Sequence, residues 1–162
     1  MKQAIVFSSQ TGNTRMLAQQ LRDLEPVYFG APAPEALTAD RIFVGFWTDK
    51  GTCDSKTAEF LKTLTDQEVF LFGTAGFGGA PDYYEKILDR VKALLPQGVR
   101  VIGSYLCQGK MPMAVRERYV KMLESGSPVP NLQGMIENFD KALSHPDQQD
   151  LEGLTEAVRK LN

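Results

Sequence analysis

Hydrophobic residues gather into short, nearly unbroken runs along the chain. Three of these runs, at residues 4–7, 42–47 and 69–72, contain almost no polar side chains. A fourth run at 99–107 is more mixed, and a weak fifth lies at 27–29. Continuous β-branched and aromatic runs are typical of parallel strands covered on both faces, so we expect five strands, with 99–107 nearer an edge.

Between the runs, apolar residues recur at helical spacing. This spacing is found at 17–24, 60–64, 84–95, 115–122 and 151–161. Strand and helix therefore alternate up to residue 125, which predicts right-handed βαβ units. We expect one α/β domain over residues 1–162: a doubly wound, parallel five-stranded sheet with helices on both faces. Beyond the Ser/Gly/Pro segment that ends at residue 130 only helices follow, so residues 126–162 are predicted to be a helical C-terminal extension that packs on the sheet.

Composition excludes several classes of protein. The 162 residues carry 18 Lys and Arg against 20 Asp and Glu, and this near-neutral balance argues against a nucleic-acid binder. No apolar run approaches the ~18 residues of a membrane span, and the first residues lack the pattern of a signal peptide, so we expect a cytoplasmic protein with no membrane partner. A single His excludes multi-His zinc sites, and we predict no metal. Cys53 and Cys107 have no His nearby in the sequence, and we expect them to be unreactive.

Candidate binding residues follow the predicted strands, because an open α/β sheet binds ligands outside the carboxyl ends of its strands. The first strand leads through Ser8 to Thr14 directly into a helix, with four hydroxyl groups and Gly12 in seven residues. Free backbone N–H groups at a helix start favour a phosphate, and hydroxyl groups add further donors. An ordinary helix cap is the simpler alternative, but one cap needs only one such residue. We therefore favour a phosphate site.

Two better-known phosphate motifs are absent. Gly109-Lys110 is followed by Met111 and not by the Ser or Thr of a Walker loop. Gly76-Phe77-Gly78 lacks the third Gly of a dinucleotide fingerprint, since position 81 is Pro. A plain NAD-dependent Rossmann enzyme is therefore not expected.

The ends of the next two long strands combine aromatic side chains with flexible backbone. Trp47 is followed by Thr48 to Thr52, and the next strand leads into the glycine-rich segment from Gly73 to Pro81. A flat heteroaromatic ring needs aromatic faces for stacking and exposed amides for its polar edge. Core packing of Trp47 and a permissive glycine turn are the alternatives for each segment alone. Three adjacent strand ends together favour a ring-bearing phosphate ester.

At this point the sequence resembles the flavodoxin family. Ser9-Gln10-Thr11-Gly12-Asn13-Thr14 fits every position of that family's phosphate loop, and the order of elements is similar over roughly residues 1–125. The resemblance implies noncovalent binding of FMN, with Trp47 on one face of the ring and Phe77, or failing that Tyr83, on the other. It implies no catalytic side chain. The implied cofactor-binding residues are Ser9, Gln10, Thr11, Gly12, Asn13, Thr14, Trp47, Thr48, Asp49, Lys50, Gly51, Thr74, Ala75, Gly76, Phe77, Gly78 and Gly79.

The chain departs from the family in two ways. Many flavodoxins have a short turn with Gly beside the aromatic residue that meets flavin N5, whereas three residues separate Trp47 from Gly51 here. Family electron carriers are also usually strongly acidic, whereas this chain has a net charge of only −2. If Lys50 and Lys110 lie around the flavin, an anionic partner or substrate is expected.

The resemblance therefore implies a single-domain FMN protein that transfers electrons to or from a partner redox enzyme. An electron carrier or reductase component is expected more than a stand-alone enzyme, because the short chain leaves little room for a nicotinamide site. One alternative is an FMN-dependent oxidoreductase that reduces a small acceptor such as a quinone or tetrapyrrole. Another is a flavin-free domain that binds phosphate esters.

Overall fold

A parallel sheet of five strands forms the centre of the protein. The computed structural model describes residues 1–78 and 81–161. The strands are β1 (Gln3–Phe7), β2 (Tyr28–Gly30), β3 (Arg41–Asp49), β4 (Thr52–Cys53), β5 (Glu68–Ala75) and β6 (Arg100–Gln108). Five of them run parallel in the order β2-β1-β3-β5-β6, and the two-residue β4 pairs antiparallel with β3. The predicted five-stranded sheet is confirmed, and the mixed run at 99–107 forms an edge strand as expected.

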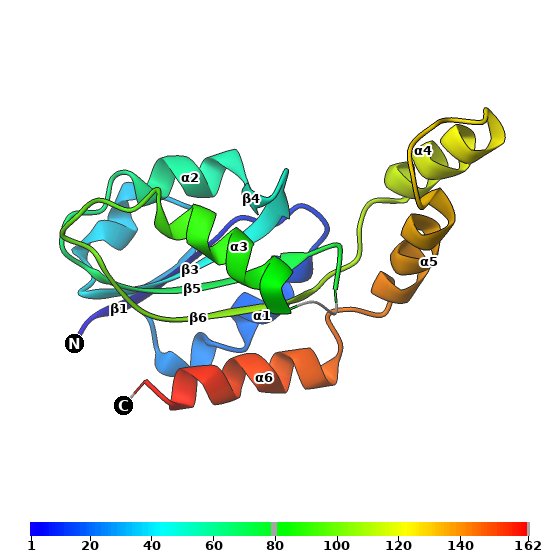
Figure 1. The fold of residues 1–162 in the computed structure, drawn as a ribbon. Coiled ribbons are helices and arrows are strands. Elements are labelled where there is room, and N and C mark those ends of the chain that lie inside the picture. The colour runs from blue at the N-terminus through cyan, green and yellow to red at the C-terminus, as the bar shows by residue number, and fades with distance from the viewer. Residues whose placement is uncertain (79–80, 162) are drawn as a thin grey trace.

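Helices cover both faces of this sheet. The α-helices are α1 (Asn13–Gln19), α2 (Ser55–Leu61), α3 (Pro81–Lys92), α4 (Met113–Glu124), α5 (Leu132–Ala142) and α6 (Gln148–Arg159), of which α1, α2, α3 and α6 lie against the sheet. Figure 1 shows α2 and α3 on one face and α1 and α6 on the other. The predicted doubly wound arrangement is therefore confirmed.

The unbroken apolar runs are explained by burial on both faces. In β3, Val44 packs with Phe60 of α2 and Ile87 of α3 in one core. Its neighbour Phe43 points to the opposite face and packs with Leu17 of α1 in the other core. Alternate residues of one strand thus enter different cores, which is why no polar alternation is seen in the sequence.

Helices α4 and α5 form a hairpin that stands away from the sheet (Figure 1). Tyr119 of α4 and Leu132 and Ile136 of α5 form a small core of their own. Arg116 and Asp140 join the two helices through an ion pair of 2.8 Å. The apolar faces of α4 and α5 pack against each other and not against the sheet. The prediction that the whole helical extension packs on the sheet is therefore correct for α6 but not for α5.

No helix in the described ranges is long and apolar enough to cross a membrane.

Candidate cofactor-binding site

The three segments that the sequence singles out meet at one edge of the sheet. They follow β1, β3 and β5, which are adjacent in the sheet. The chain leaves β1 for α1 on one face and leaves β3 for α2 on the other, so the strand order reverses between these strands (Figure 1). Such a switch point is where open α/β sheets bind their ligands.

The loop after β1 has an open shape at the start of α1. Gly12 precedes the helix with a positive φ of 89°, and no side chain caps the helix. The Gly12 N–H donates to the Ser9 hydroxyl oxygen at 3.1 Å. A Cβ atom at Gly12 would have no heavy atom within 4 Å among the described residues. The loop therefore leaves room for an anion beside backbone N–H groups.

Three side chains of this loop anchor it to the rest of the protein. Thr14 is fully buried, and its hydroxyl donates to the carbonyl oxygen of Phe46 at 3.1 Å. The side-chain amide of Asn13 donates to the carbonyl oxygen of Lys110 at 2.8 Å, and the Thr11 hydroxyl donates to the same oxygen at 3.3 Å. These side-chain donors hold the loop in place, which leaves backbone N–H groups and the side chains of Ser8, Ser9 and Gln10 available to a ligand. Gln10 is exposed.

Two buried polar atoms at this edge have no hydrogen-bond partner among the described residues. They are the side-chain oxygen of Asn13 and the hydroxyl of Thr48. Orphaned buried polar atoms are rare in folded proteins, and each calls for an explanation. A ligand with both hydroxyl and ring N–H groups, as FMN has, fits these two positions.

The segment after Trp47 is a tight hairpin instead of a free loop. Strand β3 continues through Thr48 and Asp49, which pair with Cys53 and Thr52 of β4. Lys50 and Gly51 form the turn, with φ values of 53° and 84°. Two consecutive positive φ values are typical of the tight turns of β-hairpins. Of the four cofactor-binding residues predicted at positions 48–51, only Lys50 and Gly51 are not paired with another strand.

Trp47 is held in place by Asp54, which is not among the residues predicted from the sequence. The Asp54 N–H donates to the Trp47 carbonyl oxygen at 3.1 Å, and the Trp47 N–H donates to the Asp54 carboxylate at 3.4 Å. The same carboxylate caps α2 by accepting the N–H of Thr57 at 3.2 Å. An Asp directly before a helical pattern is a recognisable cap signal and could have identified Asp54.

In the third segment, which follows β5, the first two predicted binding residues still belong to the strand. Thr74 and Ala75 are buried in β5 and pair with Cys107 and Gln108 of β6. Backbone that is not paired in the sheet therefore starts at Gly76. Gly78 is partly exposed, and Gly79 lies outside the described residues.

Two side chains fix the Gly76 peptide. The Gly76 carbonyl oxygen accepts from the amide groups of Gln108 and Asn138, each at 3.0 Å. The Gln108 amide also donates to the Asn138 side-chain oxygen at 3.1 Å. Asn138 lies on α5, so the projecting hairpin is coupled directly to this loop. Nothing in the sequence pattern of α5 distinguishes this Asn.

Both candidate aromatic residues of the third segment lie together. The rings of Phe77 and Tyr83 meet edge to face with centroids 6.4 Å apart, and Phe77 is 37% exposed. An exposed aromatic ring supported by a second ring suits stacking against a flat ligand.

Both thiols near this site have a raised pKa. Burial raises the pKa of the Cys53 thiol to about 11, with a further contribution from the nearby Asp54. Burial also raises the pKa of Cys107. His145 lies 2.7 Å from the Asp150 carboxylate beside the start of α6. Both thiols are thus kept protonated, in agreement with the expected lack of reactivity.

Comparison with known proteins identifies the family. The Flavodoxin domain family matches residues 4–159, and the chain belongs to this family. The family membership supports FMN as the cofactor, as the resemblance implies.

Relatives and solved structures agree with this assignment. The chain is 43% identical to the flavodoxin-like domain-containing protein BilS of Clostridium symbiosum (strain WAL-14163), over 93% of this chain and 90% of the relative. It resembles the structure of a short-chain flavodoxin associated with a non-canonical PDU bacterial microcompartment, with a TM-score of 0.58, 14% identity and full coverage of both chains. A flavoprotein in complex with FMN from Lactobacillus acidophilus NCFM matches with a TM-score of 0.51 and 15% identity, over 65% of this chain and 92% of that chain. These structural likenesses show a shared fold.

Proposed function

We propose that this protein binds FMN noncovalently at the switch point and transfers electrons to or from a partner redox enzyme. The observation that carries the proposal is the loop at Ser9–Thr14, which matches the family's phosphate loop and is open above Gly12. The bound flavin supplies the redox chemistry, and the protein positions it.

Each segment has a defined part in this proposal. The backbone of the loop after β1 and the Ser9 hydroxyl bind the phosphate. Trp47 and Phe77, the latter supported by Tyr83, provide aromatic surface for the ring. Gln108 and Asn138 hold the Gly76 carbonyl away from the ring, which fixes the orientation of the next backbone N–H. A preset backbone of this kind needs little rearrangement when the ligand binds.

The unpaired thiols suit a reducing compartment. Cys53 and Cys107 are both free and buried. Cysteines in this state are usual in the cytoplasm, which is where we place the protein.

A pair of glycine substitutions tests the flavin site. Gly12 and Gly126 both have positive φ values, 89° and 73°, and a Cβ atom would meet no neighbour within 4 Å at either position. Alanine at either position therefore carries the same backbone strain, about 1 kcal/mol. Only at Gly12 does the added methyl group enter the space above the phosphate loop.

FMN binding is measured by the quenching of flavin fluorescence and by the rise in Tm on ligand binding. We expect wild type and Gly126→Ala to bind one FMN alike, and Gly12→Ala to bind about tenfold more weakly, as for the loss of one strong contact. Failure of the wild type to take up FMN, or equal binding by Gly12→Ala, contradicts the proposed site.

A further inference from the structure

A second cavity adjoins the phosphate loop on the side away from the predicted ring. Its volume is about 360 Å³, and it lies between the ends of β1 and β2 and the start of α2. The sheet order places β2 on one side of β1, whereas the segments around Trp47 and Gly76 follow β3 and β5 on the other side. The cavity is therefore separate from the place where the flavin ring is expected.

The charge of this cavity is uniformly positive. Arg15, Arg22 and Lys56 line it, together with the hydroxyl groups of Ser8 and Ser9, and no carboxylate does. None of the three cations forms an ion pair with a described residue. Four other cavities in the described part of the chain each include at least one Asp or Glu in their lining. Three uncompensated cations around one cavity attract an anion.

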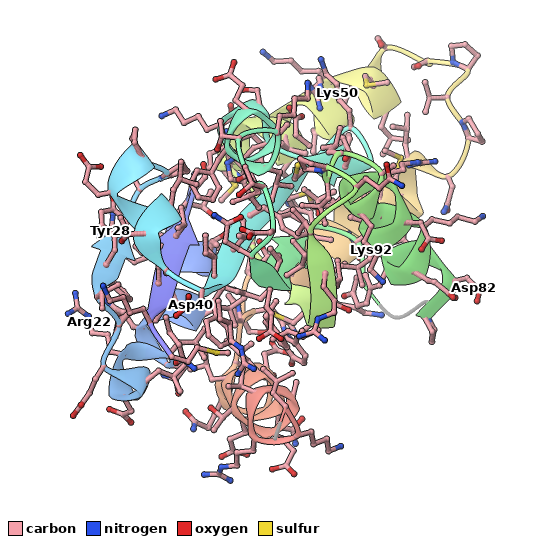
Figure 2. The ribbon with its side chains drawn as sticks, turned by 90° about the vertical axis from the view of Figure 1, so that its left-hand side faces the viewer. Arg22, Tyr28, Asp40, Lys50, Asp82 and Lys92 are labelled. Carbon is pink, nitrogen blue, oxygen red and sulfur yellow. The ribbon has the colours of Figure 1, made fainter. Side chains whose placement is uncertain are left out.

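Aromatic rings hold two of these cations in place. The Arg22 guanidinium stacks 3.9 Å from the centre of the Phe29 ring, and that of Arg15 lies 5.6 Å from the Phe7 ring. The two rings meet edge to face at 5.1 Å. A stacked guanidinium keeps the N–H donors along its edge free for a carboxylate, sulfonate or phosphate. Figure 2 shows Arg22 at the β2 side of the molecule, opposite Asp82 and Lys92.

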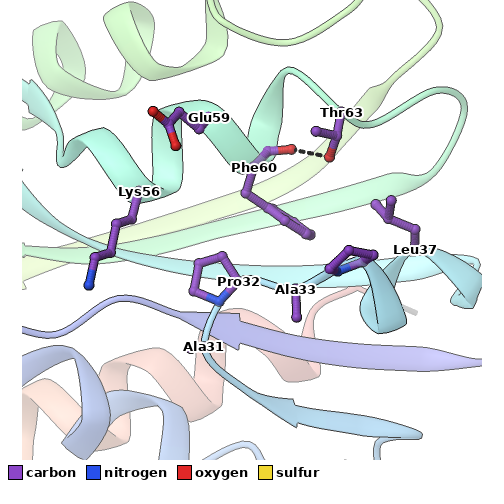
Figure 3. Close-up of a pocket in the computed structure, with 9 residues that line it drawn as sticks. Ala31, Pro32, Ala33, Leu37, Lys56, Glu59, Phe60 and Thr63 are labelled. Carbon is purple, nitrogen blue, oxygen red and sulfur yellow. Dashed lines mark hydrogen bonds between the residues drawn. The ribbon is translucent and has the colours of Figure 1, made fainter.

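An apolar groove continues from this cavity. The groove has a volume of about 430 Å³ and shares Ala31, Pro32 and Lys56 with the cation-lined cavity. Figure 3 shows Phe60 pointing from α2 toward the segment at Pro32 and Ala33, with Lys56 extending past Pro32. Positive charge at one end and apolar surface at the other match a ligand with an anionic head and an apolar body.

We propose that the cavity and the groove form a second ligand site for a small organic anion with an apolar or aromatic body. The anionic group lies among Arg15, Arg22 and Lys56, and the body lies against Phe60 and Pro32. Its three cations all lie outside the Ser9–Thr14 loop, and of the residues given to the flavin phosphate only Ser9 also lines this cavity.

A pair of matched dyes tests the proposal with the FMN-loaded protein. 1-Anilinonaphthalene-8-sulfonate carries the expected anion on an aromatic body, and N-phenyl-1-naphthylamine is its neutral counterpart. We expect saturable 1:1 binding of the sulfonate that weakens with added salt, and much weaker binding of the neutral dye. Arg22→Gln and Lys56→Gln are each expected to weaken sulfonate binding about tenfold, the effect of one charge-assisted hydrogen bond.

Arg118→Gln is the control variant. Arg118 also lies over an aromatic ring, 6.0 Å from that of Tyr119, but on α4. Three results overturn the proposal: no saturable binding of the sulfonate, an equal loss in Arg118→Gln, or release of FMN as the dye binds. FMN uptake by each variant is measured separately, so a failure of the flavin site is distinguished from a failure of this one.

Discussion

At the scale of single residues, Asp54 joins two elements of the candidate site. Its buried carboxylate accepts from the backbone N–H groups of Trp47 and Thr57 and from the Thr57 hydroxyl. It therefore links the position of the predicted stacking residue to the start of α2.

We expect Asp54→Ala to lower the free energy of unfolding by about 1–3 kcal/mol, because it removes a helix cap and leaves buried donors without an acceptor. FMN binding should weaken as well, because Trp47 loses a support. Asp54→Asn keeps one acceptor oxygen, so its stability and FMN affinity should lie between those of the wild type and of Asp54→Ala. Urea unfolding and FMN titration measure both effects, and unchanged FMN affinity in Asp54→Ala would show that Trp47 is positioned otherwise.

The Cys53 thiol provides a pH-dependent prediction. Burial raises its pKa from 9.0 to about 11, so below pH 9 the folded protein holds about 100-fold less thiolate than the unfolded chain. Iodoacetamide should label Cys53 slowly in the folded protein and quickly in urea, in a Cys107→Ser background that leaves a single thiol.

The same shift affects stability. The unfolded thiol loses its proton above pH 9.0 while the folded one keeps it up to about pH 11. The contribution of Cys53 to stability is therefore full below pH 9 and is lost as the pH rises toward 11. Fast labelling of Cys53 in the folded protein at pH 8 would contradict the raised pKa on which both predictions rest.

The sequence predicts the phosphate loop but not how its side chains are used. The hydroxyl groups of the loop are expected to donate to a phosphate, and the structure shows in addition that the Thr14 hydroxyl and the Asn13 amide donate to backbone carbonyl groups of β3 and of the segment after β6. Partners such as Phe46 and Lys110 lie far away in the sequence, so no local pattern indicates them.

At the scale of elements, the α4–α5 hairpin stands away from the sheet and still reaches the candidate site. It is joined to the site through Asn138 of α5, which donates to the Gly76 carbonyl oxygen at 3.0 Å. The hairpin thereby contributes to the shape of the third ring-binding segment.

We expect Asn138→Ala to weaken FMN binding about fivefold, since one hydrogen bond to the loop is lost while that from Gln108 remains. Arg116→Gln is the matched control, because it breaks the hairpin's own ion pair with Asp140 and leaves Gly76 untouched. FMN titration of the two variants is compared. A loss of equal size in Arg116→Gln would show that hairpin stability, and not the Asn138 contact, matters.

Elements were easier to predict than their placement. The apolar runs at 42–47 and 69–72 are confirmed as central strands because burial on both faces leaves a clear pattern. The helices after residue 130 are also confirmed, but periodicity does not tell which apolar surface a helix will meet. α5 packs on α4 whereas α6 packs on the sheet.

At the scale of the whole molecule, the candidate site is bordered by positive charge. The net charge is only −2, and Lys50 in the turn after β3 and Lys110 in the segment after β6 are both exposed. Arg90 adds a third cation by donating to the Gly51 carbonyl oxygen at 3.1 Å. Positive groups at this edge favour encounter with an anionic surface.

We expect Lys50→Glu with Lys110→Glu to slow reduction of the bound flavin by its partner about tenfold at low salt and to have less effect at high salt. FMN affinity is measured separately for the double variant, so that a weakened flavin site is distinguished from slower electron transfer. Stopped-flow kinetics at two salt concentrations measures the rate of flavin reduction. An unaltered rate would contradict the expectation that the partner is anionic.

The most direct test of the central claim is anaerobic reduction of the FMN-loaded protein, followed by the flavin absorbance. A carrier has no nicotinamide site of its own, so NAD(P)H alone should leave the flavin oxidised, and a catalytic amount of a separate NAD(P)H-dependent flavin reductase should bleach it. Rapid bleaching by NAD(P)H alone, with turnover of a quinone or tetrapyrrole acceptor, would contradict the carrier role and indicate a self-sufficient oxidoreductase.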